Sequence, residues 1–353
     1  MNGPFVSIIT PTYNHARFIE RCVRSVLEQS YPNWELIIVD DASTDGTRRS
    51  AEELAALDPR IQVIEHAEHR GAERLADTYN EALATSRGDM IAVLEGDDWW
   101  APDRLSSQVP LLRDDASVIL SYGDCWEVSE TGRPIGHVAM RISPDSLRSS
   151  PPENIAHLAT ASVPANTALI RRDALERIGG FLSAGVPVTD YPTWVALSLQ
   201  GDFVRVPRPI GYWRRHAGSV YRTHSSRIIA GCHEFFLAFT ERNAEAIRAA
   251  GADPEALILR ASGSLARKLS SLSYFDAKYE LLCGDRFRAL RKFLAVVGSP
   301  EASLRHRLAG LLGIGACLSS RRLFSLALAT RRSMRGGGPS PAGVRSHAGG
   351  ARA

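Results

Sequence analysis

The sequence of 353 residues lacks the features that define several large protein classes. Its five cysteines are scattered, with no CxxC pair and no Cys/His ligand spacing, which excludes a disulfide framework and a zinc ribbon. No run of about eighteen apolar residues occurs, so we expect no spanning helix. The first residues, MNGPFVSIIT, lack a basic segment followed by a long apolar run, so we expect no signal peptide and a cytoplasmic protein.

Two nucleotide-binding motifs are also missing. No GxGxxG follows the first predicted strand and no GxxxxGK[ST] occurs anywhere, which disfavours a dinucleotide dehydrogenase and a P-loop NTPase. Hydrophobic residues make up 44% of the chain and charged residues 23%. These are ordinary globular proportions, which exclude a fibrous or wholly disordered chain. The length indicates about two domains.

Negative charge is scarce near the C-terminus. From Glu301 onward nine arginines accompany one acidic residue, a net charge of +8, which leaves −5 for the first 300 residues of a chain with net charge +3. The basic and acidic parts are therefore expected to have different partners.

Short apolar runs alternate with amphipathic segments in the first hundred residues. This alternation predicts an α/β fold with a Rossmann-like, mostly parallel sheet flanked by helices. The apolar runs are continuous, as expected for strands covered on both faces. The expected strands are Val6–Thr10, Glu35–Val39, Ile61–Ile64 and Met90–Leu94, and the expected helices include Arg17–Gln29 and Ala72–Ser86.

The composition shifts to helix-forming residues after His224. We therefore predict an α/β domain over residues 1–223 and a C-terminal helical extension over residues 224–335, whose helices include Asp276–Val297. Residues 336–353 are rich in Gly, Pro, Ser and Ala, a composition typical of a disordered tail.

Polar residues collect where the predicted strands end. Thr10–Asn14 follows the first strand, Asp40-Asp41 the second and Asp97-Asp98 the fourth. Ligands of open α/β sheets bind at these carboxyl ends. Carboxylates repel phosphate unless a divalent cation lies between them, so the pattern implies a metal-bound diphosphate.

Three sequence blocks, in this order, resemble glycosyltransferase family 2 over about residues 5–221. They are VSIITPTYN…SVLEQSYPNWELIIVDDASTDGT, then GDMIAVLEGDDWWAPDRL, then TDYPTWVALSLQGDFVRVPRPIGYWRRHAGSV. The resemblance implies a GT-A type fold, a nucleotide-diphosphate sugar donor (often a UDP-sugar), Mg²⁺ or Mn²⁺, and inversion at the anomeric carbon. It places nucleotide-sugar binding in residues 1–115 and the acceptor and base region in residues 116–223.

The resemblance also assigns residues to the nucleotide. Pro11 and Tyr13 match positions that line the base, with the Tyr13 ring available for stacking. Asp41 matches the acid that accepts a hydrogen bond from uracil. Arg74 falls where relatives place an arginine that contacts the base or phosphate. Asp97 matches the acid near the ribose or the metal.

Catalytic assignments follow from the same blocks. Asp98 matches the direct metal ligand, and Asp190 matches the general base that takes a proton from the acceptor hydroxyl. His216 either ligates the metal or is held by local hydrogen bonds. Glu95 and Thr189 depart from the family pattern, which has Asp and Glu at these positions.

Four further residues are candidates for contacts with phosphate or acceptor. Arg214 or Arg215 could pair with phosphate oxygens, and Ser219 lies in the late loop that closes over the diphosphate in relatives. Trp100, like Trp99, is either a packing or lid residue or a platform for a sugar.

The sequence favours an inverting, metal-dependent glycosyltransferase of bacterial polysaccharide or glycoconjugate synthesis, with a saccharide or lipid-linked acceptor. The alternatives are a non-catalytic nucleotide-sugar-binding or scaffold protein and a sugar nucleotidyltransferase. The basic segment 305–335 either lies on the inner face of an anionic membrane or caps the catalytic domain. Nucleic-acid binding is not expected, because aromatics do not alternate with the basic residues.

Overall fold

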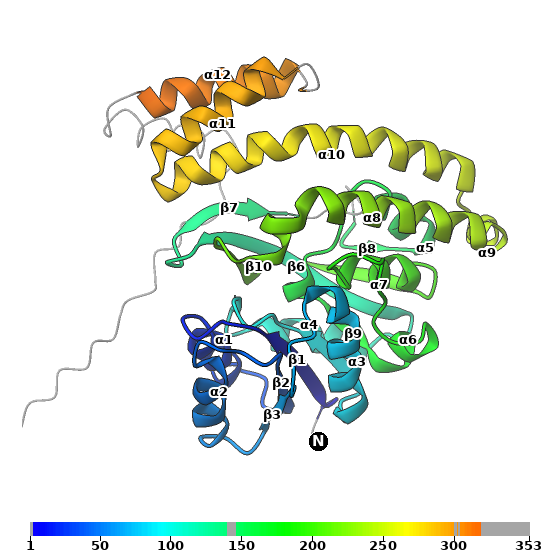
Figure 1. Ribbon diagram of the computed structural model, residues 1–353. Helices are drawn as coiled ribbons and strands as arrows, with labels where there is room; N and C mark the ends of the chain where they lie inside the picture. The colour runs from blue at the N-terminus through cyan, green and yellow to red at the C-terminus, as the bar shows by residue number, and fades with distance from the viewer. Residues whose placement is uncertain (1–2, 140–145, 300–301, 303, 319–353) are drawn as a thin grey trace, which may run out of the picture. The chain divides into compact units, whose positions relative to one another are not determined.

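The computed structural model describes residues 3–139, 146–299, 302 and 304–318 (Figure 1). The chain divides into two compact units, Met1–Leu272 and Ser273–Ala353. None of the helices within the described residues combines the length and apolar character that a bilayer crossing requires.

A single mixed sheet forms the centre of the first unit, with the strand order β3-β2-β1-β4-β9-β6-β10-β5. β7 pairs with β6, and β8 pairs with β10. The strands are Val6–Thr12 (β1), Trp34–Asp40 (β2), Ile61–Glu65 (β3), Met90–Val93 (β4), Trp99–Trp100 (β5), Val118–Ser129 (β6), Pro134–Val138 (β7), Arg148–Ser149 (β8), Leu169–Arg171 (β9) and Asp202–Arg215 (β10).

The parallel pairing expected from the sequence covers the N-terminal half of this sheet. β1 pairs in parallel with both β2 and β4, and β2 pairs in parallel with β3. β9 is antiparallel to β4 and to β6, while the long strands β6 and β10 are again parallel. The fold is therefore mixed α/β. The end of β10 lies beside the loop that follows β4, where Arg214 bonds to Asp98.

Helices cover both faces of the sheet in the first unit (Figure 1). On one face they bury Ile8, Leu36 and Ile38, and on the other Ile9 and Ile37. Continuous apolar strands result, because successive side chains point to opposite faces. The helices up to β10 are Ile19–Leu27 (α1), Thr47–Ala55 (α2), Leu75–Thr85 (α3), Arg104–Arg113 (α4), Pro151–Leu158 (α5), Arg172–Arg177 (α6) and Asp190–Leu197 (α7), with 3-10 turns Ala72–Arg74 (η1) and Ala165–Thr167 (η2).

The first unit extends beyond the boundary predicted near Thr223. Helices Val220–Arg242 (α8) and Ala244–Ala249 (α9) and the first part of Pro254–Cys283 (α10) belong to it. They contribute four buried side chains to the larger core cluster: Phe236, Ile247, Leu257 and Ala261. The division falls after Leu272 because these helices complete a core that the sheet alone leaves uncovered.

The second unit has a small helical core of its own. It contains the end of α10 with Arg286–Gly298 (α11) and Leu304–Leu318 (α12), which bury Phe293 and Cys317. The helix predicted over Asp276–Val297 is broken, since Gly284 has a φ of +96° and Asp285 begins α11 by accepting a hydrogen bond from the backbone N–H of Arg288. The predicted tail 336–353 lies outside the described residues.

Candidate active site

The ends of β1, β2 and β4 meet at one edge of the sheet. Thr12 is paired with Asp40, and the backbone N–H of Gly96 donates to the carbonyl of Pro11 at 3.1 Å. The loops after β1 and β2 turn through left-handed residues, Asn14 with φ of 54° and Ala42 with φ of 57°. The Asn14 Oδ1 accepts from the backbone N–H of Thr44 at 2.8 Å, which ties the two loops together.

Three side chains at this edge could hold a cation. Single ligand atoms of His15, Asp97 and His216 all lie within 4.8 Å of one another. His216 Nε2 is 2.9 Å from Asp97 Oδ2. Burial raises the pKa of Asp97, but His15 and His216 outweigh that effect and hold it below its usual value. Two imidazoles and an ionised carboxylate form a donor set suited to a divalent metal such as Mn²⁺.

Asp98, predicted as the direct metal ligand, lies outside this cluster. Its Oδ1 accepts from the backbone N–H of Arg214 at 2.7 Å, and its Oδ2 accepts from Asn166 Nδ2 at 2.8 Å. The side chain is buried, and burial, with the charges of Asp97 and Glu95, raises its pKa well above the usual value. In this structure both Asp98 oxygens are therefore engaged by protein donors, whereas Asp97 is the carboxylate that lies in the cluster with His15 and His216.

Asp41 is buried just after β2, and its carboxylate accepts three hydrogen bonds. His66 Nδ1 and the backbone N–H of Arg70 donate to Oδ1 at 2.7 and 2.9 Å. The backbone N–H of Gly71 donates to Oδ2 at 2.9 Å, and His69 Nδ1 lies 2.8 Å from the same oxygen. Burial raises the pKa of Asp41, but these donors outweigh it, so the net shift is downward. Asp41 is therefore held as a carboxylate.

The other predicted nucleotide residues are placed differently. Tyr13, just beyond β1, exposes 37% of its surface. Pro11 is buried within β1, opposite Val39. Arg74 ends η1 and pairs with Asp77 at 2.7 Å, with an exposed side chain. His69 contacts both Tyr13 and Asp41, whereas Arg74 is engaged in a local surface ion pair.

Glu95 is affected by both the metal-type cluster, formed by His15, Asp97 and His216, and the predicted base Asp190. The Tyr79 hydroxyl donates to Glu95 Oε1 at 2.9 Å. Burial, followed by the charges of Asp97 and Asp190, raises the pKa of Glu95 to about 7. Burial also raises the pKa of Tyr79, and Glu95, Asp190 and Asp97 add to that shift. Asp97 and Asp190 therefore both lie near enough to Glu95 and Tyr79 for their charges to raise the two pKa values.

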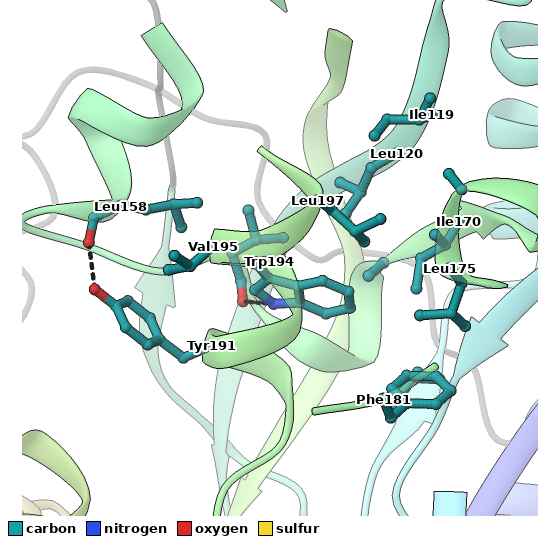
Figure 2. Close-up of a cluster of buried hydrophobic side chains, with 14 of the residues drawn as sticks. Ile119, Leu120, Leu158, Ile170, Leu175, Phe181, Tyr191, Trp194, Val195 and Leu197 are labelled. Carbon is teal, nitrogen blue, oxygen red and sulfur yellow. Dashed lines mark hydrogen bonds between the residues drawn. The ribbon is translucent and has the colours of Figure 1, made fainter. Parts of the chain in front are cut away.

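Asp190 occupies the first turn of α7, which is fixed by two buried aromatic residues (Figure 2). The Trp194 indole donates to the carbonyl of Val163 at 3.2 Å, and the Tyr191 hydroxyl donates to the carbonyl of Leu158 at 2.7 Å. Burial raises the pKa of Asp190 to about 6. A carboxylate with that pKa can accept a proton near neutral pH.

The loop before α7 is held by side chains that bond to its backbone. Asn80 accepts from the backbone N–H of Phe181 at 2.8 Å and donates to its carbonyl at 2.9 Å. The Thr189 hydroxyl donates to the carbonyl of Leu182 at 2.7 Å, and Thr193 donates back to Thr189 at 2.6 Å. Thr189, which departs from the family pattern, thus orients the residue that follows it.

Both arginines at the end of β10, predicted as phosphate contacts, also contact the protein itself. The buried Arg214 guanidinium donates to the carbonyls of Asp97 and Glu130, each at 2.7 Å. Arg215 lies over the Trp213 ring at 4.5 Å. Arg214 thus fixes the loop that carries the acidic residues through two of its side-chain donors.

Ser219 and Trp100 also have structural contacts. Ser219 precedes α8, and its hydroxyl accepts from the backbone N–H of His216 at 3.3 Å. Trp100 is buried, donates to the carbonyl of Asn166 at 2.8 Å and packs against Arg104 at 3.6 Å. The Trp100 ring is buried and Arg104 covers one of its faces, so a sugar cannot stack on it in this structure.

Several residues of the site were not predicted from the sequence. His15 joins the metal-type cluster, His69 reaches both Tyr13 and Asp41, and Tyr79 supports Glu95. Only His15 carried a usable signal, since it directly follows the polar run at the end of the first strand. The other two come from loops or helices whose position depends on the tertiary fold.

Comparison with known proteins identifies the class. Residues 7–179 match the model of glycosyl transferase family 2. The UDP-Glc:alpha-D-GlcNAc-diphosphoundecaprenol beta-1,3-glucosyltransferase WfaP of Escherichia coli is 31% identical over 218 residues, covering 61% of this chain and 79% of WfaP. The chain belongs to glycosyltransferase family 2.

Other matches are shorter or more distant. TuaG of Bacillus subtilis (strain 168), a glycosyltransferase named for teichuronic acid biosynthesis, is 41% identical over 132 residues, 37% of this chain and 51% of TuaG. The matches to EpsE of Bacillus subtilis (strain 168) and WcaA of Escherichia coli (strain K12) cover 39% and 37% of the length of those proteins. The chain therefore spans about half or less of the length of the curated relatives it first matches.

A solved structure supports the fold. The mannosyltransferase PcManGT from Pyrobaculum calidifontis, in complex with GDP-Man and Mn²⁺, superposes with a TM-score of 0.52 at 23% identity, covering 93% of this chain and 84% of that one. The architecture is therefore of the GT-A type, as the sequence blocks implied.

Proposed function

We propose that the protein transfers a sugar from a nucleotide-diphosphate sugar to an acceptor hydroxyl, with inversion at the anomeric carbon. One observation carries the proposal: ligand atoms of His15, Asp97 and His216 gather at the edge of the sheet where β1, β2 and β4 end, and Asp97 and Asp190 both raise the pKa of the buried Glu95. Such an arrangement would set a diphosphate-binding group and a proton acceptor near one reacting carbon.

The donor diphosphate would bind beside His15, Asp97 and His216. Their imidazole and carboxylate donor atoms fit a divalent cation, and PcManGT was solved with Mn²⁺. When bound, such a cation would offset the charge that develops on the departing diphosphate. Asp98 and Arg214 would keep Asp97 directed toward the cation through the loop contacts described above.

Asp190 would act as the general base. As the acceptor oxygen bonds to the anomeric carbon, its proton passes to the Asp190 carboxylate and the bond from that carbon to the diphosphate oxygen breaks. The nucleoside diphosphate leaves on the opposite face, which inverts the configuration. Ionised Asp190 is the active form, and its pKa of about 6 leaves it mostly ionised at neutral pH.

The nucleotide is proposed to be a uridine diphosphate and the acceptor a lipid-linked saccharide of bacterial polysaccharide synthesis. The name of WfaP specifies UDP-Glc and a diphosphoundecaprenol-linked acceptor, and that relative supports both parts. Tyr13 and Asp41 offer the stacking face and the carboxylate that a uracil base requires.

Release of nucleoside diphosphate from a panel of nucleotide sugars tests the proposal. We expect Mn²⁺- or Mg²⁺-dependent turnover with a UDP-sugar, and Asp190→Asn should reduce it by about 1,000-fold or more while leaving UDP affinity unchanged. Full activity of Asp190→Asn would contradict the assignment of the base. Binding of UDP-sugars without turnover by any acceptor would favour a non-catalytic binding protein.

A membrane contact is proposed for the second unit. Helix α12 carries five leucines that each expose more than half of their surface: Leu304, Leu308, Leu311, Leu312 and Leu318. Arg288, Arg291 and Arg305 are exposed in the same unit. Apolar side chains beside arginines are suited to the surface of an anionic membrane, where a lipid-linked acceptor would be available.

A further inference from the structure

His69 lies directly on the ring that is proposed to stack with the nucleobase. The centroids of the His69 and Tyr13 rings are 3.7 Å apart and their planes differ by 20°. At this separation the rings are in van der Waals contact, so no second ring fits between them. His69 belongs to the loop between β3 and η1, and 43% of its side chain is exposed.

The same imidazole also lies against Asp41: its Nδ1 is 2.8 Å from Asp41 Oδ2 and hydrogen-bonds to the Asp41 backbone carbonyl at 3.1 Å. A carboxylate accepts about four hydrogen bonds, and three protein donors, His66 and two backbone amides, are bonded to this one. Because His69 stands beside Oδ2, a base N–H reaches the remaining acceptor position only if the imidazole moves. His66 is almost fully buried and the other two donors are backbone amides, whereas the His69 side chain is exposed, which makes it the group that can be displaced.

We propose that His69 fills the nucleobase subsite of the free protein and that the donor base displaces it. The incoming base would stack on Tyr13 and donate a ring N–H to Asp41, replacing both contacts of the imidazole. Uracil has such a donor at N3, whereas N3 of cytosine is an acceptor. This inference rests on the proposed function, and it makes His69 a residue that sets nucleotide affinity.

Displacement lowers the apparent affinity by the fraction of molecules in which the subsite is free. If His69 is in place in about nine of ten molecules, the apparent Kd is about tenfold higher than the intrinsic value. Removing the imidazole should therefore strengthen nucleotide binding, the opposite of what loss of a binding residue does. The Asp41 carboxylate keeps three donors in the variant, so its burial remains compensated.

Calorimetric titration of the full chain with UDP in the presence of Mn²⁺ tests this inference. We expect His69→Ala to lower the Kd for UDP by about three- to tenfold. Glu68→Ala is the matched control, because Glu68 is exposed in the same loop and should leave the Kd unchanged. Unchanged or weaker UDP binding by His69→Ala would overturn the inference.

A second measurement observes His69 in the wild-type protein. Stacking on Tyr13 shifts the NMR signals of the His69 ring, which we expect to move toward solvent-exposed values when UDP is added but not with equal CDP. Signals that stay in place at saturating UDP would also overturn the inference, while leaving the proposed function intact. If neither wild type nor His69→Ala binds any nucleoside diphosphate, the proposed function fails and the inference with it.

Discussion

Adjacent acidic residues in this site differ in protonation and partners because they face different surroundings. Asp97 is held ionised by His15 and His216, whereas the neighbouring Asp98 is enclosed by protein donors and has a raised pKa. Glu95 has a pKa of about 7 beside Tyr79. Each carboxylate therefore has a separate task, although the sequence presents them as one acidic run.

Turnover should depend on the ionisation of Asp190. Because the base acts when ionised and its pKa is about 6, kcat should rise with pH through about 6 and level off above it. Below that value we expect about a tenfold loss per pH unit. A pH profile of kcat at saturating donor and acceptor measures this, and a flat profile between pH 5 and 7 would exclude Asp190 as the titrating base.

The same raised pKa predicts a gain in stability from Asp190→Asn. The carboxyl is more basic in the folded state than the unfolded value of about 3.9, so its ionisation destabilises the fold as pH rises through about 6. The variant should be more stable than wild type by about 3 kcal/mol at pH 8 and by only about 0.5 kcal/mol at pH 4. Urea unfolding at both pH values measures the difference, and an equal gain at both would refute this electrostatic cause.

Asp97 and Asp98 should respond differently to substitution by asparagine. Asp97→Asn should abolish the rise in Tm that Mn²⁺ gives the wild type, because a ligand that binds the native state stabilises it. Asp98→Asn should cost about 1–3 kcal/mol without metal, since an amide group would face the donors of Asn166 or Arg214. Its rise in Tm with Mn²⁺ should remain, and the reverse result would return the ligand role to Asp98.

At the scale of elements, the site depends on how closely the loop after β4 packs on β1. A Cβ added to Gly96 would lie 2.6 Å from Thr12 Oγ1 and 3.0 Å from His15 Nδ1. The absence of a side chain there brings His15 beside Asp97. The glycine is thus required by a close approach between two strand ends.

Gly96→Ala should weaken Mn²⁺ binding by about tenfold or more, because it displaces the residue that holds and orients His15. Gly263→Ala in α10 is the control, since its nearest atom lies at 3.9 Å and alanine favours a helix. Titration of Mn²⁺ followed by Tm separates the two variants. Equal affinity of Gly96→Ala and wild type would show that His15 is not needed.

Element boundaries show what local pattern predicts and where it fails. The four strands of the parallel half were predicted from apolar runs, and each ends at or near the residue expected. The helix expected over Asp276–Val297 is interrupted at Gly284-Asp285, a pair that ends one helix and caps the next. The apolar periodicity continues through this break. It therefore concealed the helix end that Gly284 and Asp285 indicate.

At the scale of the whole molecule, the chain combines a unit that carries the candidate active site with a basic helical unit. The first ends at Leu272, and the second presents leucines and arginines to the surface. A transferase that acts on a lipid-linked acceptor would benefit from a surface that holds it at the bilayer.

Sedimentation with vesicles tests that contact. The wild type should bind phosphatidylglycerol vesicles better than phosphatidylcholine vesicles, and less so in high salt. Leu308→Gln with Leu312→Gln should weaken binding by about tenfold or more, since each buried leucine contributes about 1.5–3 kcal/mol. Leu57→Gln with Leu259→Gln is the control, because these two leucines of the first unit are at least as exposed as Leu308 and Leu312. Equal loss in both pairs would rule out α12 as the contact.

The sequence by itself determined the fold class, the order of the N-terminal strands and the positions of Asp41, Asp97 and Asp190 at element ends, because apolar periodicity and short polar runs are local properties. The tertiary structure decided which carboxylate joins the histidine cluster (Asp97) and which is enclosed by protein donors (Asp98). It also decided which histidines lie beside them, because β10 and distant loops reach the same edge of the sheet. Those contacts join residues up to 119 positions apart, and no spacing rule within one element encodes them.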